Sequence, residues 1–192
     1  MIELKNICKS YGDPPVAVLD NVNLKFPEGI TCIMGPSGVG KTTLIYTVAG
    51  LVVADSGKIV GRDGKKLSIV FQEDRLLDWE SAITNVLFVS KSSRADFDRA
   101  KLLLERSGLA DSIYKKASEL SGGMRRRVCI CRALIADYDL LILDEPFKGL
   151  DNEMRLEVME MVKEYSRGKI VICVTHDLDE VEFLGGSLVE LK

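Results

Sequence analysis

Hydrophobic positions along the chain follow two periodicities, and the two alternate. Short apolar or alternating runs predict β-strands at residues 2–7, 19–26, 29–35, 57–61, 67–72, 139–145, 169–175 and 187–191. Helical spacing follows the third run, from Lys41 to a stop at Gly50, and returns at residues 152–168 and 177–185. This alternation predicts an α/β fold with a largely parallel, buried sheet.

The middle of the chain has a different pattern. Residues 81–89, residues 94–108 and the segment after Ser121 show helical spacing, charged faces and few strand signals. We therefore expect a helical subdomain at about residues 78–136, inserted into a single domain that spans residues 1–192. A chain of 192 residues that is 46% hydrophobic can build such a domain without a metal or disulfide staple.

Composition narrows the class of protein. The five cysteines form no CxxC pair and lie mostly in apolar runs, which favours buried, reduced thiols and a reducing compartment. The first residues lack the apolar block of a signal peptide, and no apolar run reaches the roughly 18 residues of a membrane span. These features predict a cytoplasmic protein. A net charge of -3 argues against nucleic acid as a partner.

The segment "GPSGVGKT", residues 35–42, matches the GxxxxGK[ST] pattern in full and lies between a predicted strand and a predicted helix. Its glycines let the backbone wrap a phosphate chain, while Lys41 can reach the β and γ phosphates and Thr42 can ligate Mg²⁺. An ordinary glycine-rich turn is a poor alternative, because a chance match to the full pattern in this context is rare. The segment predicts a nucleotide phosphate site.

Two carboxylates, Asp144 and Glu145, end the apolar strand at residues 139–145. The carboxyl ends of parallel strands are where ligands bind in such sheets. Successive strand residues point to opposite sides, so we expect the two carboxylates to have separate tasks. Asp144 would hold Mg²⁺ through its water shell, and Glu145 would orient and polarise the attacking water. With the phosphate loop, they predict a nucleotidase.

A second candidate anion site is "LSGGM", residues 120–124, where a serine and two glycines open a helix. With these three motifs in this order, the whole chain resembles the ATP-binding cassette (ABC) family of transporter ATPases. The resemblance implies a P-loop NTPase fold with a mainly parallel core sheet, a small antiparallel β subdomain and an inserted α-helical subdomain. It also implies a second copy of the cassette as partner, paired head to tail, so that "LSGGM" of each chain closes over the ATP of the other.

The resemblance assigns roles to four further residues. Tyr11 matches the aromatic residue that stacks on adenine, and Gln72 matches the glutamine that senses Mg²⁺ and contacts the membrane subunit. Asp151 matches the loop that crosses to the other subunit, and His176 matches the switch histidine at the γ phosphate. The implied catalytic set is Lys41, Gln72, Glu145 and His176, and the implied Mg²⁺ set is Thr42, Gln72 and Asp144. ATP would contact Tyr11, Gly35, Pro36, Ser37, Gly38, Val39, Gly40, Lys41, Thr42, Thr43, Ser121, Gly122, Gly123 and Asp151. Taken singly, a tyrosine near a strand end is usually a half-buried packing residue, and a glutamine that ends an apolar strand is commonly its first solvated residue. A lone histidine could be a hydrogen-bonded edge residue.

Four positions depart from the family pattern or leave alternatives open. Met124 replaces the usual glutamine of the signature, and Lys148 stands where a small residue usually precedes the "LD" loop. The loop from Gln72 resembles that of importers for nitrate, sulfonate and taurine, with Asp78 at their proline position. Trp79 in this loop would lie at the docking surface for integral membrane permease subunits, or else anchor the core of the helical subdomain.

The run "RRR", residues 125–127, predicts a solvated helix face with one arginine in an internal ion pair, because consecutive helical residues fan out around the axis. For the same reason Cys129 and Cys131 cannot chelate a metal along one helical face, and both are expected in the core.

The family resemblance predicts an ATP-hydrolysing subunit, peripheral on the inner face of the cell membrane, that powers solute transport through separate membrane subunits. A soluble ABC ATPase in DNA repair, translation or cluster assembly is the alternative, although such proteins often carry tandem cassettes, coiled coils or basic extensions. A nucleotide-gated switch with little turnover would more often lack Glu145 or His176, and both are present.

Overall fold

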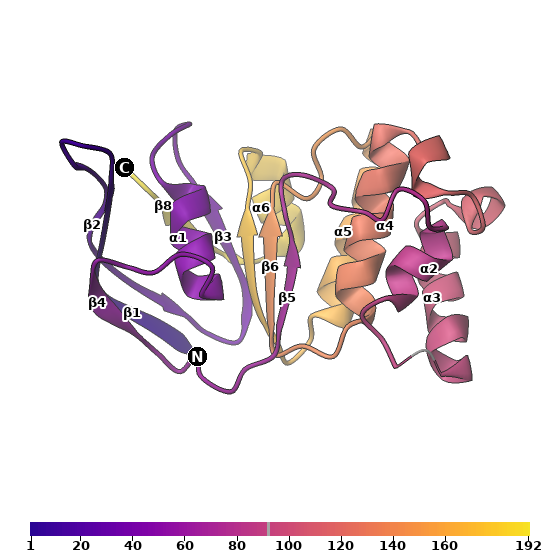
Figure 1. The fold of residues 1–192 in the computed structure, drawn as a ribbon, viewed down its shortest axis with the longest axis horizontal. Coiled ribbons are helices and arrows are strands. Elements are labelled where there is room, and N and C mark those ends of the chain that lie inside the picture. Colours follow the sequence, from indigo (N-terminus) through magenta and orange to yellow (C-terminus); the bar gives the residue numbers. More distant parts are fainter. Residues whose placement is uncertain (92) are drawn as a thin grey trace.

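A five-stranded parallel sheet forms the centre of the molecule. The computed structural model describes residues 1–91 and 93–192. The sheet consists of β3 (Gly29–Met34), β5 (Leu67–Val70), β6 (Leu140–Asp144), β7 (Ile170–Val174) and β8 (Ser187–Glu190). Their order is β5-β6-β7-β3-β8, and all four pairings are parallel. Figure 1 shows these strands in the middle of the fold. Strands β6 and β7 are buried at every residue, which explains why both are apolar except for Asp144 at the end of β6.

A smaller antiparallel sheet lies at one end of the molecule (Figure 1). It consists of β1 (Ile2–Tyr11), β2 (Val16–Phe26) and β4 (Ser56–Val60), in the order β2-β1-β4. Its buried side chains include Ile2, Leu4, Ile7, Leu19 and Phe26. The predicted combination of a parallel core sheet and a small antiparallel sheet is therefore confirmed.

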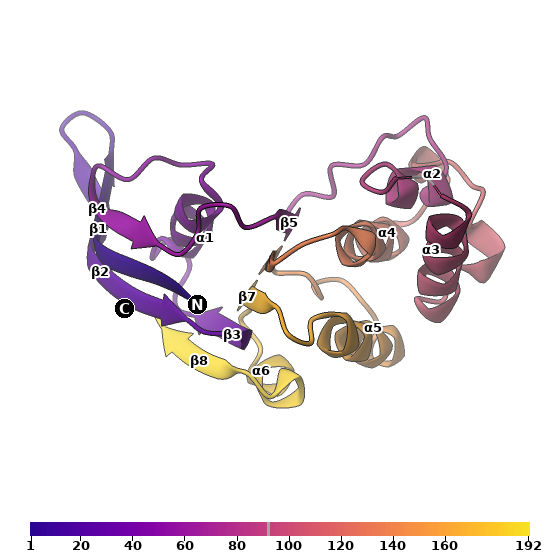
Figure 2. The ribbon, with the colours of Figure 1, turned by 90° about the horizontal axis from the view of Figure 1, so that it is seen from below.

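Helix α1 (Lys41–Ala49) lies between the two sheets, as both ribbon views show (Figures 1 and 2). Leu44, Ile45 and Val48 are fully buried and belong to the same apolar cluster as residues of both sheets. The helix ends at Gly50, whose φ of 79° is the left-handed conformation that glycine adopts without strain. Helix α1 therefore joins the two sheets into one core and fixes the phosphate loop that precedes it.

The opposite face of the parallel sheet is covered by α4 (Gly122–Ile135), α5 (Asn152–Tyr165) and α6 (Leu178–Leu184). Helices α2 (Ala82–Leu87) and α3 (Arg94–Arg106) and the 3₁₀ turns Ala110–Ser112 and Ala117–Glu119 lie beyond α4, far from the antiparallel sheet (Figure 2). Their apolar residues belong to one cluster with α4. Helices α2, α3 and α4 and the two 3₁₀ turns fall within residues 78–136, whereas α5 and α6 do not. The division of the chain at those boundaries stays a prediction.

The structure tests two predictions made from composition: buried, reduced cysteines and no membrane-spanning segment. All five cysteines are free thiols, and Cys32, Cys129, Cys131 and Cys173 are buried, whereas Cys8 is partly exposed. The predicted core positions of Cys129 and Cys131 are confirmed, and burial raises the pKa of each of these two thiols to about 12. Within residues 1–91 and 93–192, no helix has both the length and the apolar character needed to cross a bilayer.

Candidate nucleotide-binding site

Four strands of the parallel sheet end in predicted site residues at one edge. The phosphate loop follows β3, Gln72 comes shortly after β5, Asp144 ends β6, and His176 comes shortly after β7. Because these strands are parallel neighbours, their carboxyl ends lie together, although the residues are far apart in sequence. The fold thus brings the predicted catalytic groups to one side of the sheet.

The phosphate loop turns directly into the N-terminus of α1. Gly40 precedes the helix with a φ of 99°, and a Cβ there would lie 2.8 Å from the carbonyl oxygen of Val18, so only glycine fits. Lys41 is buried, and its Nζ donates to the carbonyl oxygens of Gly35 (2.7 Å) and Pro36 (2.8 Å). The ammonium group has three donors, so one remains for a phosphate oxygen.

Thr42 and Asp144 meet beside this loop. The hydroxyl of Thr42 donates to Oδ2 of Asp144 over 3.4 Å. Asp144 is only 1% exposed. Burial raises the pKa of its carboxyl, the charge of Glu145 adds to this, and Thr42, Arg126 and Lys41 oppose it. A hard divalent cation would offset the cost of this buried charge, and a hydroxyl with a carboxylate is a donor set that fits Mg²⁺.

Glu145 follows β6 in a left-handed backbone conformation, with a φ of 47°. Its Oε1 lies 2.8 Å from Nε2 of His176, and its Oε2 accepts from Nζ of Lys148 at 3.0 Å. Burial raises the pKa of this carboxyl, but the hydrogen bonds from Lys148 and His176 outweigh burial, and the pKa is lowered. Glu145 and His176 also line a pocket of about 290 Å³.

The two carboxylates therefore have separate partners, but for a reason that differs from the predicted one. Strand alternation does not separate them, because Glu145 lies outside β6. The left-handed turn at Glu145 directs it toward His176, whereas Asp144 faces Thr42. A positive φ at a residue other than glycine is strained, and such strain is frequent at functional sites.

Tyr11 ends β1 and is paired with Val16 of β2, the strand whose Val18 contacts Gly40. Its ring is 46% exposed, and Nζ of Lys9 lies 5.4 Å from the ring centre. Tyr11 therefore has an exposed part that could stack on a base, and its role in adenine binding stays a prediction.

Ser121 and Asp151 occupy N-cap positions of two other helices. The Ser121 hydroxyl accepts from the Met124 amide at 3.4 Å, and the Asp151 carboxylate accepts from the Met154 amide at 3.0 Å. Ser121, Gly122 and Asp151 are exposed. In the part of the chain that the structure describes, no hydrogen bond or ion pair joins any of the three to the phosphate loop.

Comparison with known proteins decides the family. Residues 19–148 match the family described as ABC transporter. The chain is also 37% identical over 201 residues to an aliphatic sulfonates import ATP-binding protein of Burkholderia cenocepacia, and the match covers 100% of this chain and 73% of that protein. The chain belongs to the ABC transporter family.

Further relatives and solved structures agree with this assignment. The ABC cassette described here is 37% identical over 207 residues to a bicarbonate transport ATP-binding protein of Synechocystis sp. (98% of this chain, 73% of the relative). It is 35% identical over 209 residues to a taurine import ATP-binding protein of Escherichia coli (100% and 80%). The dimeric structure of a bacterial ABC transporter cassette is similar at a TM-score of 0.89 and 30% identity, covering 100% of this chain and 94% of that one. The predicted family, fold and ATPase class are confirmed.

A second solved structure bears on the nucleotide. The dimeric structure of a post-hydrolysis state of an ATP-binding cassette, bound to ADP and Pi, has a TM-score of 0.88 to this chain at 30% identity, and the match covers 100% of this chain and 94% of that one. As a member of the same family, this chain is an ATP-binding cassette, and its phosphate loop carries the full GxxxxGK[ST] pattern.

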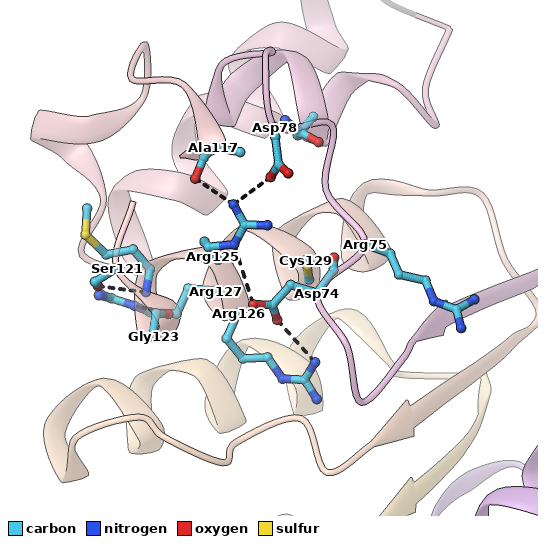
Figure 3. Close-up of polar contacts among 12 residues, drawn as sticks. Asp74, Arg75, Asp78, Ala117, Ser121, Gly123, Arg125, Arg126, Arg127 and Cys129 are labelled. Carbon is cyan, nitrogen blue, oxygen red and sulfur yellow. Dashed lines mark hydrogen bonds and ion pairs between the residues drawn. The ribbon is translucent and has the colours of Figure 1, made fainter. Parts of the chain in front are cut away.

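The arginine run of the cassette differs from the prediction. Residues 125–127 do not form a solvated face: Arg125 and Arg127 are partly buried, and Arg126 is only 5% exposed. The expected internal ion pair is present, between Arg126 Nη1 and Asp74 Oδ1 at 3.5 Å (Figure 3). The physical reason is the position of α4 against the sheet, which directs Arg126 at the strand ends. Consecutive arginines give no sequence signal of this burial.

Trp79 is 70% exposed, so the interpretation of this residue as a core anchor is wrong. The loop that carries it is nevertheless held in place. The buried side chain of Asn85 accepts from the Leu77 amide at 2.8 Å and donates to the Leu77 carbonyl at 3.0 Å. Arg125 donates to Asp78 at 2.8 Å (Figure 3). Trp79 is therefore an exposed residue of a loop that hydrogen bonds hold in place.

Proposed function

We propose that this ABC cassette hydrolyses ATP to drive the import of a small solute through separate membrane subunits. The proposal rests on the 2.8 Å contact between Glu145 Oε1 and His176 Nε2, at the same sheet edge as the contact between Thr42 and Asp144. A candidate base and a candidate cation site thus flank one phosphate loop. Relatives named for the import or transport of sulfonates, taurine and bicarbonate favour a small anionic or zwitterionic solute.

In this proposal the phosphate loop residues 35–43 bind the phosphates of ATP, and Tyr11 stacks on adenine. Lys41 stabilises the charge that develops on the transferred phosphoryl group. Thr42, Gln72 and Asp144 would hold Mg²⁺, which would supply positive charge against the charge of the phosphates. These roles agree with the buried lysine and with the hydroxyl and carboxylate pair.

Glu145 acts as the base that accepts a proton from the attacking water. Both of its oxygens are engaged, one by His176 and one by Lys148. If His176 turns to the γ phosphate, Oε1 of Glu145 is released and can face the water. The side chain of His176 is 49% exposed, so this rotation requires no repacking of the core.

We further propose that two copies pair head to tail. Ser121, Gly122, Gly123 and Asp151 would then contact the ATP held by the other copy. This arrangement is supported by the exposure of Ser121, Gly122 and Asp151. It is also supported by the similarity to dimeric cassettes. Each of two composite sites would combine the phosphate loop of one copy with residues 120–124, the signature segment, of the other copy.

Integral membrane permease subunits are the proposed partners, docked on the surface from Gln72 to Trp79, which places the cassette in the cytoplasm on the inner face of the membrane. The alternative is an ABC ATPase in DNA repair, translation or cluster assembly. The two proposals differ in one measurable respect, because only a transport subunit is retained by a polytopic membrane protein.

Replacement of Glu145 by Gln tests the catalytic proposal. The amide keeps the shape of the side chain but cannot accept a proton, so turnover is expected to fall roughly 10²- to 10⁴-fold while ATP binding persists. With ATP and Mg²⁺, the variant should accumulate as a dimer in gel filtration. Glu153→Gln, in the first turn of α5, is the matched control. A monomer with normal turnover would remove Glu145 from this role.

A further inference from the structure

The buried guanidinium of Arg126 donates hydrogen bonds to the carbonyl oxygens at the end of β6. Nη2 of Arg126 donates to the carbonyls of Asp144 (2.6 Å) and Glu145 (2.8 Å), and its Nε donates to the carbonyl of Pro146 (3.0 Å). Arg126 belongs to α4, and none of these acceptors lies on that helix. A cation from a distant helix therefore binds three successive carbonyls around the candidate base.

The same guanidinium also reaches the end of β5. Nη1 of Arg126 donates to the carbonyls of Phe71 (2.5 Å) and Gln72 (3.3 Å), and it lies 3.5 Å from Oδ1 of Asp74. Figure 3 shows this ion pair of Arg126 and Asp74 beneath α4. Asp74 supplies a counter-charge, which a cation with only 5% exposure requires. One side chain thus joins the backbone of Gln72 to the backbone of Glu145.

The convergence of carbonyls explains how the strained turn is maintained. In a regular strand, successive carbonyls point in opposite directions, whereas the carbonyls of Asp144, Glu145 and Pro146 all point to one group. The left-handed φ of 47° at Glu145 produces this arrangement. Neighbouring carbonyl dipoles that converge repel each other unless a cation lies between them, and the planar fork of arginine offers several donors in fixed directions.

The neighbouring arginines donate to other hydrogen-bond acceptors, although Arg125 also forms an ion pair with Asp74 at 3.8 Å. Arg125 donates to the Ala117 carbonyl and to Asp78, and Arg127 donates to the carbonyls of Ser107 and Gly123. Consecutive residues on a helix point in different directions, so only the middle arginine faces the two strand ends (Figure 3). The function of Arg126 is therefore not shared with the other two.

We propose that Arg126 is a positioning residue for ATP hydrolysis, which fixes the backbone turn of Glu145 and its location relative to Gln72. This proposal rests on the proposed role of Glu145 as the base. Arg126 does not touch the phosphate loop, which follows β3, through any contact among the described residues. Loss of the guanidinium therefore alters catalysis more than the binding of ATP.

Two substitutions of different severity test the proposal. Arg126→Gln removes the charge and shortens the side chain, and Arg126→Lys keeps the charge without the planar fork. A small displacement of a catalytic group can cost about 10²-fold, so we expect kcat to fall roughly 10- to 100-fold in Arg126→Gln and less in Arg126→Lys. The Kd for ATP should stay near that of the wild type in both.

Arg132→Gln is the matched control. Arg132 lies on the same helix and donates to the carbonyls of Arg75 (3.0 Å) and Asp74 (3.5 Å). Among the described residues, no hydrogen bond or ion pair joins Arg132 to the end of β6. Arg132→Gln should retain wild-type kcat. Circular dichroism and thermal unfolding of all three variants separate a loss of catalysis from a loss of fold.

A double-mutant cycle gives the readout that a purely structural role would not produce. If Arg126 acts through Glu145, then adding Arg126→Gln to Glu145→Gln should slow single-turnover hydrolysis little further. Full additivity, unchanged kcat in folded Arg126→Gln, or parallel loss of kcat, ATP affinity and thermal stability would each overturn the proposal. Failure of both Arg126 variants to fold would also overturn it, because the role would be structural. Normal turnover of Glu145→Gln alone would instead refute the proposed base.

Discussion

Lys148 contacts one oxygen of Glu145, at a position where a small residue is usual in the family. Its side chain is 72% exposed, and an exposed ion pair contributes only about 0–1 kcal/mol to folding stability. The contact therefore affects the carboxyl group of Glu145 and contributes little to folding stability. Together with His176, Lys148 lowers the pKa of the Glu145 carboxyl against the opposing effect of burial.

Replacement of Lys148 by Met should make turnover more sensitive to acid. Removal of the ammonium group should raise the pKa of Glu145, and a base must be ionised to act. As the pH falls, the variant should lose turnover at a higher pH than the wild type. As the pH rises, the carboxyl ionises in either protein, so the difference should become small. Measurement of kcat across the acid range checks this shift.

The control for Lys148→Met is Lys101→Met, which removes another exposed lysine that pairs with a glutamate, Glu105, far from the site. The free energy of unfolding of both variants should lie within about 1 kcal/mol of that of the wild type. Acid limbs that superimpose for wild type and Lys148→Met would show that the ion pair does not control the base.

At the scale of elements, periodicity predicts which segments form strands and helices, but not how the strands pair. Strands β4 and β5 are both short and are consecutive in the chain. However, β4 pairs antiparallel with β1 in one sheet, and β5 pairs parallel with β6 in the other. Pairing depends on contacts between distant residues, and a local pattern contains no information about them.

The same limit applies to the site. The proximity of Thr42 and Asp144 could be predicted, because their two motifs lie at the carboxyl edge of a parallel sheet. The burial of Arg126 could not be predicted, since its acceptors are carbonyls of two strands that come together only in the fold. For Trp79 the sequence left two alternatives, a docking surface or a core anchor, and could not decide between them because large apolar residues are usually buried.

The proposed docking surface is an element-scale prediction. The indole of Trp79 is 70% exposed, and substitutions of exposed residues usually change stability by no more than about 0.5 kcal/mol. Trp79→Ala should therefore keep its melting temperature and its ATPase activity in the absence of membrane subunits. It should lose retention by the polytopic membrane protein that captures the tagged wild-type cassette.

Phe97→Ala is the control for Trp79→Ala, because Phe97 is an aromatic residue of α3 that is 36% exposed. This variant should be retained like the wild type. A much lower melting temperature of Trp79→Ala would show that the indole supports the fold, and undiminished retention would move the docking surface elsewhere. Absence of any membrane partner for the wild type would favour the alternative of a non-transport ATPase.

At the scale of the whole molecule, the chain contains two segments suited to phosphate. The phosphate loop precedes α1 between the two sheets, and the signature segment precedes α4 beyond the parallel sheet (Figure 1). Ser121 is exposed and makes its N-cap hydrogen bond within α4. A single chain thus supplies one half of each of two sites. The head-to-tail dimer is the arrangement that would complete both.

Mixing two defective variants tests this dimer. Lys41→Ala removes the charge of the phosphate loop but keeps the signature, whereas Ser121→Arg keeps the phosphate loop and blocks the signature with a bulky side chain. Each homodimer contains two defective sites. In a mixed dimer, one site combines both defects and the other combines two intact halves, so mixing should restore ATP trapping and part of the hydrolysis.

Trapping of one nucleotide per mixed dimer is the safer measurement, because turnover recovers only in part if the two sites must act together. The control is a mixture of Lys41→Ala with Lys41→Ala/Ser121→Arg, in which both sites lack the lysine and no rescue is expected. If folded Lys41→Ala and Ser121→Arg chains, mixed at several ratios, regain neither trapping nor turnover, then the composite site is wrong. In that case Ser121 and its glycines would have to act within their own chain, on a phosphate that the fold would need to bring across the parallel sheet.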